Sequence, residues 1–142
     1  MKPADAGACP CGRLDAKRRP LNWNACCGRY VDHFSSAPAP DAESLMRSRY
    51  SAFVRERAGY LLATWAPSHR PVALDFEPGC QWLGLDVRAH RMLDGTHAEV
   101  EFIARSRLRG RATRLHERSR FVRAHDADGT ARWFYVDGEI FE

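Results

Sequence analysis

Four of the five cysteines form two close pairs near the start of the chain, in the segments CPCG and NACCGRY. Zinc binds thiolates readily and holds four ligands in a tetrahedron, which two chelating pairs from one chain can supply. Since four protein ligands leave no coordination position for water or a substrate, the pattern predicts one structural zinc ion and not a catalytic one. The predicted ligands are Cys9, Cys11, Cys26 and Cys27.

Other metal ligands and other thiol chemistry are the alternatives to this interpretation. His33 and the fifth cysteine, Cys80, lie outside the paired pattern, and we expect both to be bystanders. Redox-active or disulfide-forming thiols are the main alternative for the four paired cysteines. The opening sequence MKPADAGACPCGR has no apolar stretch typical of a secretory signal, so we expect a cytoplasmic protein whose thiols stay reduced.

A second candidate for chemistry is a glutamate in a stretch of alternating residues at about 115–124. Glu117 and Ser119 there share one face with the apolar Leu115 and Phe121. If this face is the concave side of a sheet, a carboxylate stands on an apolar wall, where it could act as a general base. The candidate pocket residues are Glu117, Ser119, Phe121, Trp82 and Tyr135.

The simpler interpretation of this glutamate is that an arginine from a preceding helix, Arg47 or Arg49, neutralises it, because buried carboxylates are usually paired. Trp82 and Tyr135 then form core walls and do not stack on a ligand. No segment matches a glycine-rich phosphate loop, an HExxH motif or a Ser/His/Asp order, so we assign no catalytic residue and expect a protein that is not an enzyme.

The composition is typical of one globular domain. The chain has 142 residues, 44% of them hydrophobic, 28% charged and 11% aromatic, which is enough for a packed core. No run of about 18 apolar residues predicts a membrane span. The net charge of +4 is too small to indicate a nucleic-acid-binding protein. Residues 102–116, however, contain five arginines and no acid: either a solvated hairpin end or a phosphate or RNA contact.

Helices are predicted before strands along the chain. The Pro/Ala/Ser stretch at 35–40 separates the cysteine segment, 1–35, from a second domain, 36–142. Asp41 is typical of a helix N-cap, and the helical pattern that follows breaks at Gly59 before a second short helix that ends ahead of Pro67.

From Trp82 onward the hydrophobic period is two, and Asp94-Gly95 predicts a hairpin turn. Pairing Leu93 with Thr96 gives one apolar face and one face of matched charges. The predicted pairs are Leu85–Ala104, Val87–Phe102, Ala89–Val100, Arg88–Glu101 and His90–Glu99. With further strands at about 115–124 and 132–136, the pattern predicts an α+β fold with helices packed on one face of an antiparallel sheet.

Several segments, in order, resemble the bacterial YchJ family of uncharacterised proteins. They cover about residues 8–141 and read CPCG, ACCGRY, LMRSRYSAFV, YLLATW, WLGLDV, EVEFIAR, HERSRF and WFYVDG. The cysteine pairs also resemble the SEC-C zinc motif found in the preprotein translocase motor SecA. This resemblance implies zinc at the four paired cysteines, followed by a nuclear-transport-factor-2-like cone whose concave face often holds a ligand.

The resemblance also implies a partner, because SEC-C motifs elsewhere dock to protein or ribosomal partners. We therefore expect an interaction or adaptor protein that contacts a protein or an RNA, with a small-molecule-binding or hydrolytic cone as the alternative. The Arg-rich spacer Gly12–Ala25 is longer than the family usually has, and we expect it to be tolerated with unchanged ligation. The candidate partner-binding residues are Arg13, Lys17, Arg18, Arg19 and Trp23.

Overall fold

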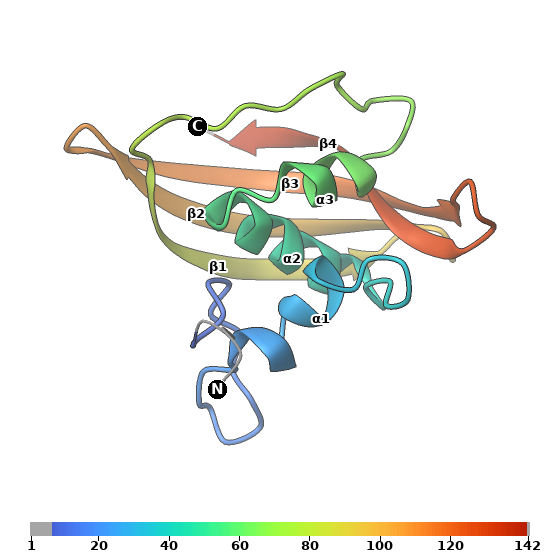
Figure 1. Ribbon diagram of the computed structural model, residues 1–142, viewed down its shortest axis with the longest axis horizontal. Coiled ribbons are helices and arrows are strands. Elements are labelled where there is room, and N and C mark those ends of the chain that lie inside the picture. Colours follow the sequence, from blue (N-terminus) through green and yellow to red (C-terminus); the bar gives the residue numbers. More distant parts are fainter. Residues whose placement is uncertain (1–6, 142) are drawn as a thin grey trace.

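The computed structural model describes residues 7–141 and has helices on one face of a four-stranded antiparallel sheet (Figure 1). The strands follow one another in the order of the sequence, and the cysteine segment projects from the same side as the helices. The α+β expectation is confirmed. The elements are η1 (Trp23–Ala25), α1 (Gly28–Val31), α2 (Ala42–Val54), α3 (Ala58–Ala63), β1 (Gln81–Met92), β2 (His97–Leu108), β3 (Arg111–His125) and β4 (Ala131–Phe141).

The principal helix, α2, begins where the sequence predicts. The Asp41 side chain accepts a hydrogen bond from the Ser44 backbone N–H at 2.7 Å and so caps the first turn. The prediction of a break at Gly59 is wrong by a few residues, because α3 contains Gly59. The chain turns earlier, at Glu56, whose φ of 56° lies in the left-handed region.

The predicted hairpin between β1 and β2 is correct at its far end and wrong near the turn. Leu85 pairs with Ala104 and Val87 with Phe102, as expected. A β-bulge then inserts Arg88 between Val87 and Ala89, so every later residue of β1 moves by one position. The corrected pairs, in place of Ala89–Val100, Arg88–Glu101 and His90–Glu99, are Ala89–Glu101, His90–Val100 and Arg91–Glu99.

The last two strands are longer than expected. β3 extends to Arg111 at one end, and β4 continues to Phe141, whereas the alternation alone suggested an end near Val136. The dipeptide Asp137-Gly138 resembles a turn, but here it lies within the ladder, with Gly138 opposite Ser119. The turn between the strands is polar, because the Asp126 carboxylate accepts the backbone N–H groups of residues 128 and 130.

One core joins the cysteine segment to the sheet. Cys9, Trp23, Leu45 and Phe121 belong to the same cluster of buried side chains. The β4 strand also binds the chain after α3: Ala66 N–H donates to the Tyr135 carbonyl at 2.7 Å. No helix among residues 7–141 has the length and apolar character needed to cross a membrane.

Candidate functional sites on opposite faces of one helix

The four paired cysteines converge on one point. Their Sγ atoms lie within 4.8 Å of one another, and all four side chains are buried. The Cys9–Cys11 and Cys11–Cys26 sulfur pairs are 3.7 and 3.6 Å apart. Four sulfurs about 2.3 Å from a zinc ion lie about 3.8 Å from one another, whereas a disulfide requires about 2.05 Å. The donor set therefore fits a tetrahedral metal ion and not a disulfide.

Local backbone structure makes this convergence possible. The long spacer doubles back as an irregular hairpin, with bridges from Ala8 to Asn22 and from Leu14 to Pro20, which brings the two pairs together despite its length. After the second pair the chain passes beneath Trp23. A Cβ at Gly28 would lie 2.6 Å from the Trp23 carbonyl oxygen, so only glycine fits there.

The crowded thiols have opposed proton affinities. Contacts with Cys11 lower the pKa of Cys9 and raise the pKa values of Cys26 and Cys27. Hydrogen bonds with Cys26 and then Cys27 lower the pKa of Cys11 to about 7. Some thiols thus ionise readily only while their neighbours keep their protons. Four thiolates can share this volume when a divalent cation neutralises them.

Helix α2 contacts the cysteine cluster with two polar side chains and the spacer with a third. Ser51 Oγ lies 3.5 Å from Cys9 Sγ, and Arg47 Nη1 donates to the Cys11 carbonyl at 3.2 Å. The Ser44 hydroxyl accepts a hydrogen bond from Arg13 at 3.0 Å. Since residues 44, 47 and 51 share one helical face, α2 presents a polar side to the cluster.

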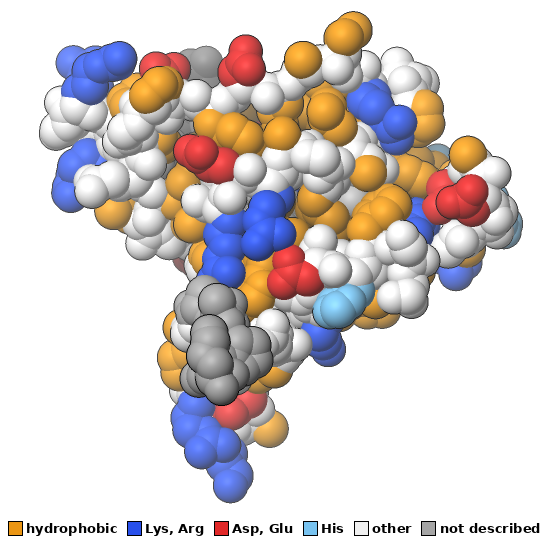
Figure 2. Space-filling model, in the orientation of Figure 1, with side chains coloured by type: hydrophobic (Ala, Val, Ile, Leu, Met, Phe, Trp, Pro, Cys, Tyr) orange, Lys and Arg blue, Asp and Glu red, His pale blue; other side chains and the backbone are white. Residues whose placement is uncertain are grey.

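Of the five candidate partner-binding residues, three are exposed and two pack against the rest of the protein. Lys17, Arg18 and Arg19 are exposed at the end of the projecting spacer, where Figure 2 shows a concentration of basic side chains. Arg13 folds back onto α2. Trp23 is only 1% exposed, and its Nε1 donates to Asp32 at 2.7 Å, so the expectation that Trp23 faces a partner is corrected. His33 and Cys80 lie outside the cluster, as expected.

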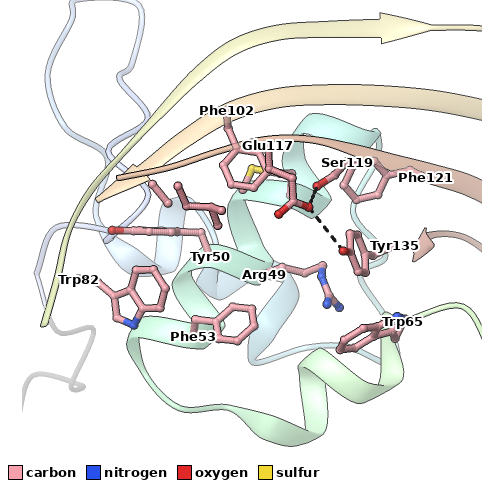
Figure 3. A pocket seen from close by; sticks show the side chains of 13 residues that line it. Arg49, Tyr50, Phe53, Trp65, Trp82, Phe102, Glu117, Ser119, Phe121 and Tyr135 are labelled. Atoms are coloured by element: carbon pink, nitrogen blue, oxygen red, sulfur yellow. Dashed lines mark hydrogen bonds between the residues drawn. The ribbon is translucent and has the colours of Figure 1, made fainter. Parts of the chain in front are cut away.

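A pocket of about 200 Å³ lies between the opposite face of α2 and the concave face of the sheet (Figure 3). It brings together all five residues named as pocket candidates from the sequence. Its walls are mostly apolar and aromatic. The lining residues are Met46, Arg49, Tyr50, Phe53, Trp65, Trp82, Phe102, Ala104, Leu115, Glu117, Ser119, Phe121 and Tyr135.

Glu117 is the acidic group of this pocket and is only 9% exposed. Ser119 Oγ donates to its Oε2 at 2.7 Å, and the Tyr135 hydroxyl makes a longer contact of 3.5 Å with the same oxygen. The carboxylate lies over Gly138 on β4, where an added Cβ would be 2.0 Å from Oε2. The glycine within the β4 ladder therefore makes room for the glutamate.

Arg49 is the basic group of the pocket, and it forms no salt bridge with Glu117, although the two charges attract each other. Its Nη1 donates to the Leu61 carbonyl at 2.7 Å and to Thr64 Oγ1 at 2.6 Å, which joins α2 to α3. Arg47 pairs with Glu43 on the other face of α2. The expectation that either arginine pairs with Glu117 is corrected, because the two helix contacts hold Arg49 elsewhere. Burial lowers the pKa of Arg49 to about 10, which still leaves it charged at neutral pH.

Sequence reasoning named Arg49 only as one of two possible ion-pair partners of Glu117 and not as a residue that lines the pocket. Met46, Tyr50 and Phe53 form an apolar stripe at helical spacing, which is typical of ordinary core packing. Arg49 interrupts this stripe, and a charge within an apolar helical face is the signal that could have identified it. Its guanidinium lies 4.6 Å from the centre of the Tyr135 ring and 5.1 Å from that of Trp65.

Comparisons with known proteins agree with this architecture. The family model of the YchJ middle NTF2-like domain matches residues 41–138. A UPF0225 protein of Polaromonas sp. is 66% identical over 132 residues, 92% of this chain and 91% of that protein. A UPF0225 protein of Bordetella parapertussis is 51% identical over 141 residues, covering 97% and 96%.

A solved structure is similar over almost the whole chain. It is the crystal structure of a SEC-C motif containing protein from Psychrobacter arcticus, with a TM-score of 0.78 and 34% sequence identity, covering 95% of this chain and 83% of the other. The paired cysteines, the cone of helices on a curved sheet and these matches agree, and the chain belongs to the YchJ (UPF0225) family, with a SEC-C motif before an NTF2-like domain.

Proposed function

We propose that this protein binds a small organic molecule in the pocket beneath α2, and that the cysteine cluster holds one structural zinc ion that keeps the helix in place. The carrying observation is Glu117, an acid on an apolar wall beside an open cavity, with no ion pair to the arginine that shares the cavity. Buried charges without a direct ion pair are costly, and a bound ligand would supply the missing interactions.

The polar contacts of Glu117 suit a binding role. Ser119 and Tyr135 both approach Oε2. Among residues 7–141, none donates a hydrogen bond to Oε1. One carboxylate oxygen therefore fixes the orientation of the side chain, and the other is available to a ligand in the cavity. Aromatic walls with a few convergent polar groups are typical of small-molecule sites.

Native mass spectrometry of protein purified from its own cells tests this proposal. We expect an organic mass that leaves on denaturation, together with one zinc ion. A Glu117→Gln variant should retain less of that mass. The matched control is Glu101→Gln, because Glu101 contacts His116 on the opposite face of the sheet. Retention that is equal in all three proteins would count against the pocket, and a complete absence of organic mass would overturn the proposal.

The proposal of zinc rests on the donor set. Four buried thiols at the spacing of a tetrahedron are the ligands of structural zinc sites. Elemental analysis of the purified protein should give one zinc per chain, and each cysteine of the cluster should be protected from alkylation until the metal is removed. Another metal, or alkylation of the native thiols, would overturn the zinc assignment.

Docking to a protein or RNA partner is the second candidate function. The exposed basic tip of Lys17, Arg18 and Arg19 favours it, although Arg13 and Trp23 no longer contribute to that surface. Arg18→Glu/Arg19→Glu with zinc still bound should abolish capture of the partner. The comparison variant, Arg120→Glu/Arg123→Glu, reverses two exposed charges on β3 outside the arginine-rich segment 102–116 and should leave capture intact. Capture that survives the first double change would exclude docking through this tip.

A further inference from the structure

Arg49 has one edge of its guanidinium available for a ligand. Nη1 makes both hydrogen bonds that fix the side chain to the Leu61 and Thr64 region. Among residues 7–141, no acceptor binds Nε or Nη2. These two nitrogens form one side of the planar fork and together suit a carboxylate or a carbonyl oxygen. The rings of Trp65 and Tyr135 also contact the guanidinium and limit its rotation.

A further polar group in the lining has no partner. The indole Nε1–H of Trp65 is buried and finds no acceptor among the described residues. An unsatisfied buried donor destabilises the free protein. Because this nitrogen has almost no accessible surface, the donors that the cavity offers are those of Arg49, and the free acceptor is that of Glu117. Tyr135 lies between them, with its ring against Arg49 and its hydroxyl towards Glu117 (Figure 3).

The balance of charge restricts the ligand further. Arg49 and Glu117 give the pocket one positive and one negative group in apolar surroundings. An anion would be attracted by Arg49 but repelled by Glu117. A cation would be attracted by Glu117 but repelled by Arg49. Low dielectric makes each mismatch costly. A molecule without net charge can satisfy both groups at once.

The cavity also limits the size of the ligand. An apolar cavity of about 150 Å³ accommodates benzene, and this one measures about 200 Å³. Its walls include the rings of Tyr50, Phe53 and Trp82. A single ring with one or two polar substituents fits such a space, whereas a nucleotide or a lipid does not.

We propose that the ligand of this pocket is a ring-sized molecule without net charge, which offers an acceptor oxygen to Arg49 and an N–H donor to Glu117. This inference rests on the proposed function, because it names the ligand class of the same pocket. It covers zwitterions and neutral amides, which share this pair of groups.

Five single-ring probes test the inference: phenylglycine and benzamide, which carry no net charge, benzoate, benzylamine and toluene. Dissociation constants come from NMR titration of the folded, zinc-loaded protein, followed at amides of the lining residues. We expect phenylglycine or benzamide to bind at least about tenfold more tightly than benzoate, benzylamine and toluene, since a hydrogen bond to a charged group contributes that much or more.

Glu117→Gln supplies the second readout, with Glu101→Gln as control. Without the carboxylate the pocket carries only the charge of Arg49, so benzoate should gain about tenfold relative to benzylamine, a change that a purely structural role would not cause. The control should leave the order of affinities unchanged. If no probe binds, the pocket function itself fails. If toluene or a charged probe binds as tightly as the uncharged pair, or Glu117→Gln leaves the order unchanged, the pocket function stands and the inference is overturned.

Discussion

The cysteine cluster and the pocket lie on opposite faces of α2 and handle buried polar groups in opposite ways. The cluster gathers four like groups, all within 4.8 Å, which one cation can neutralise together. The pocket keeps two unlike charges apart, each held by neighbours that prevent an ion pair. The first arrangement is complete with a metal ion and leaves nothing for a substrate, whereas the second leaves donors and an acceptor facing a cavity. In our proposal, the cluster therefore stabilises the fold, and the pocket destabilises it as long as no ligand is bound.

The largest effect should follow loss of a cluster ligand. Cys11→Ser should remove the metal and lower the free energy of unfolding by more than about 3 kcal/mol, because lost metal sites belong to the few mechanisms with effects of this size. Chemical denaturation and elemental analysis measure the two quantities. Cys80→Ser is the control, since Cys80 lies outside the cluster, and an equal loss there would remove the distinction.

Removal of the metal should also weaken the pocket. On α2, Arg47 and Ser51 contact the cluster, and Arg49 and Tyr50 line the cavity. Removal of the metal with a chelator should loosen the contacts of the cluster with α2 and thereby shift the side chains that line the cavity. We expect the thermal midpoint to fall by about 10 °C or more and the affinity for the best single-ring probe to fall severalfold. A metal-free protein that stays folded and keeps full affinity would show that the two sites are independent.

The next effect concerns the pocket alone. Gly138→Ala places a Cβ where the Glu117 carboxylate lies, so the glutamate must move. We expect a loss of about 1–3 kcal/mol from overpacking, shifted amide signals along β3, and retention of zinc. Gly95→Ala is the matched control, because nothing lies within 4 Å of that added Cβ, and it should change stability by less than about 0.5 kcal/mol. Equal effects at the two positions would contradict the placement of Glu117.

The smallest effect is a pH dependence of the unfolding free energy that arises from Asp32, which lies beside the cysteine segment. Although partial burial opposes it, hydrogen bonds from Trp23 and Arg57 lower the pKa of Asp32. A lowered pKa in the folded state contributes stability above the ordinary value near 4, and that stability is lost as the pH falls through the folded value. Asp32→Asn should therefore be less stable than the parent at pH 7, and the difference should shrink below about pH 4. A constant difference in unfolding free energy would contradict this contribution.

Local signals in the sequence predicted much of this fold. The Asp41 cap, the hairpin at Asp94-Gly95 and the alternation around Phe121 each depend on neighbouring residues, and each corresponds to an observed element. The bulge at Arg88 escaped prediction because its residue types fit a regular ladder equally well. The end of β4 escaped because Gly138 resembles a turn, while its actual role depends on Glu117 in the neighbouring strand.

In the candidate sites, too, local patterns were predictable, and contacts between residues distant in sequence were not. Four cysteines in two pairs are a local pattern, and the structure brings their side chains together as that pattern predicts. Glu117, Ser119 and Phe121 are predicted as pocket residues from their shared strand face, but the contacts that hold Arg49 away from Glu117 are not. The orientation of the arginine is set by the Leu61 carbonyl and by Thr64, which lie in a different helix and the turn after it. Likewise, the sequence predicts a surface position for Trp23, but its ring is buried in the core and its Nε1 donates to Asp32.

The bulges in β1 have a consequence for the behaviour of the chain in a crowded cell. β1 and β4 are the outer strands of the sheet, and an unpaired strand edge is a template for aggregation. Irregularities beside Trp82 and Ala89 interrupt the β1 edge, so a second chain cannot extend it in regular register. On β4, the segment after α3 binds Tyr135 through its backbone and occupies part of the other edge. Two unrelated local features thus oppose the pairing of this open sheet with the edge of another.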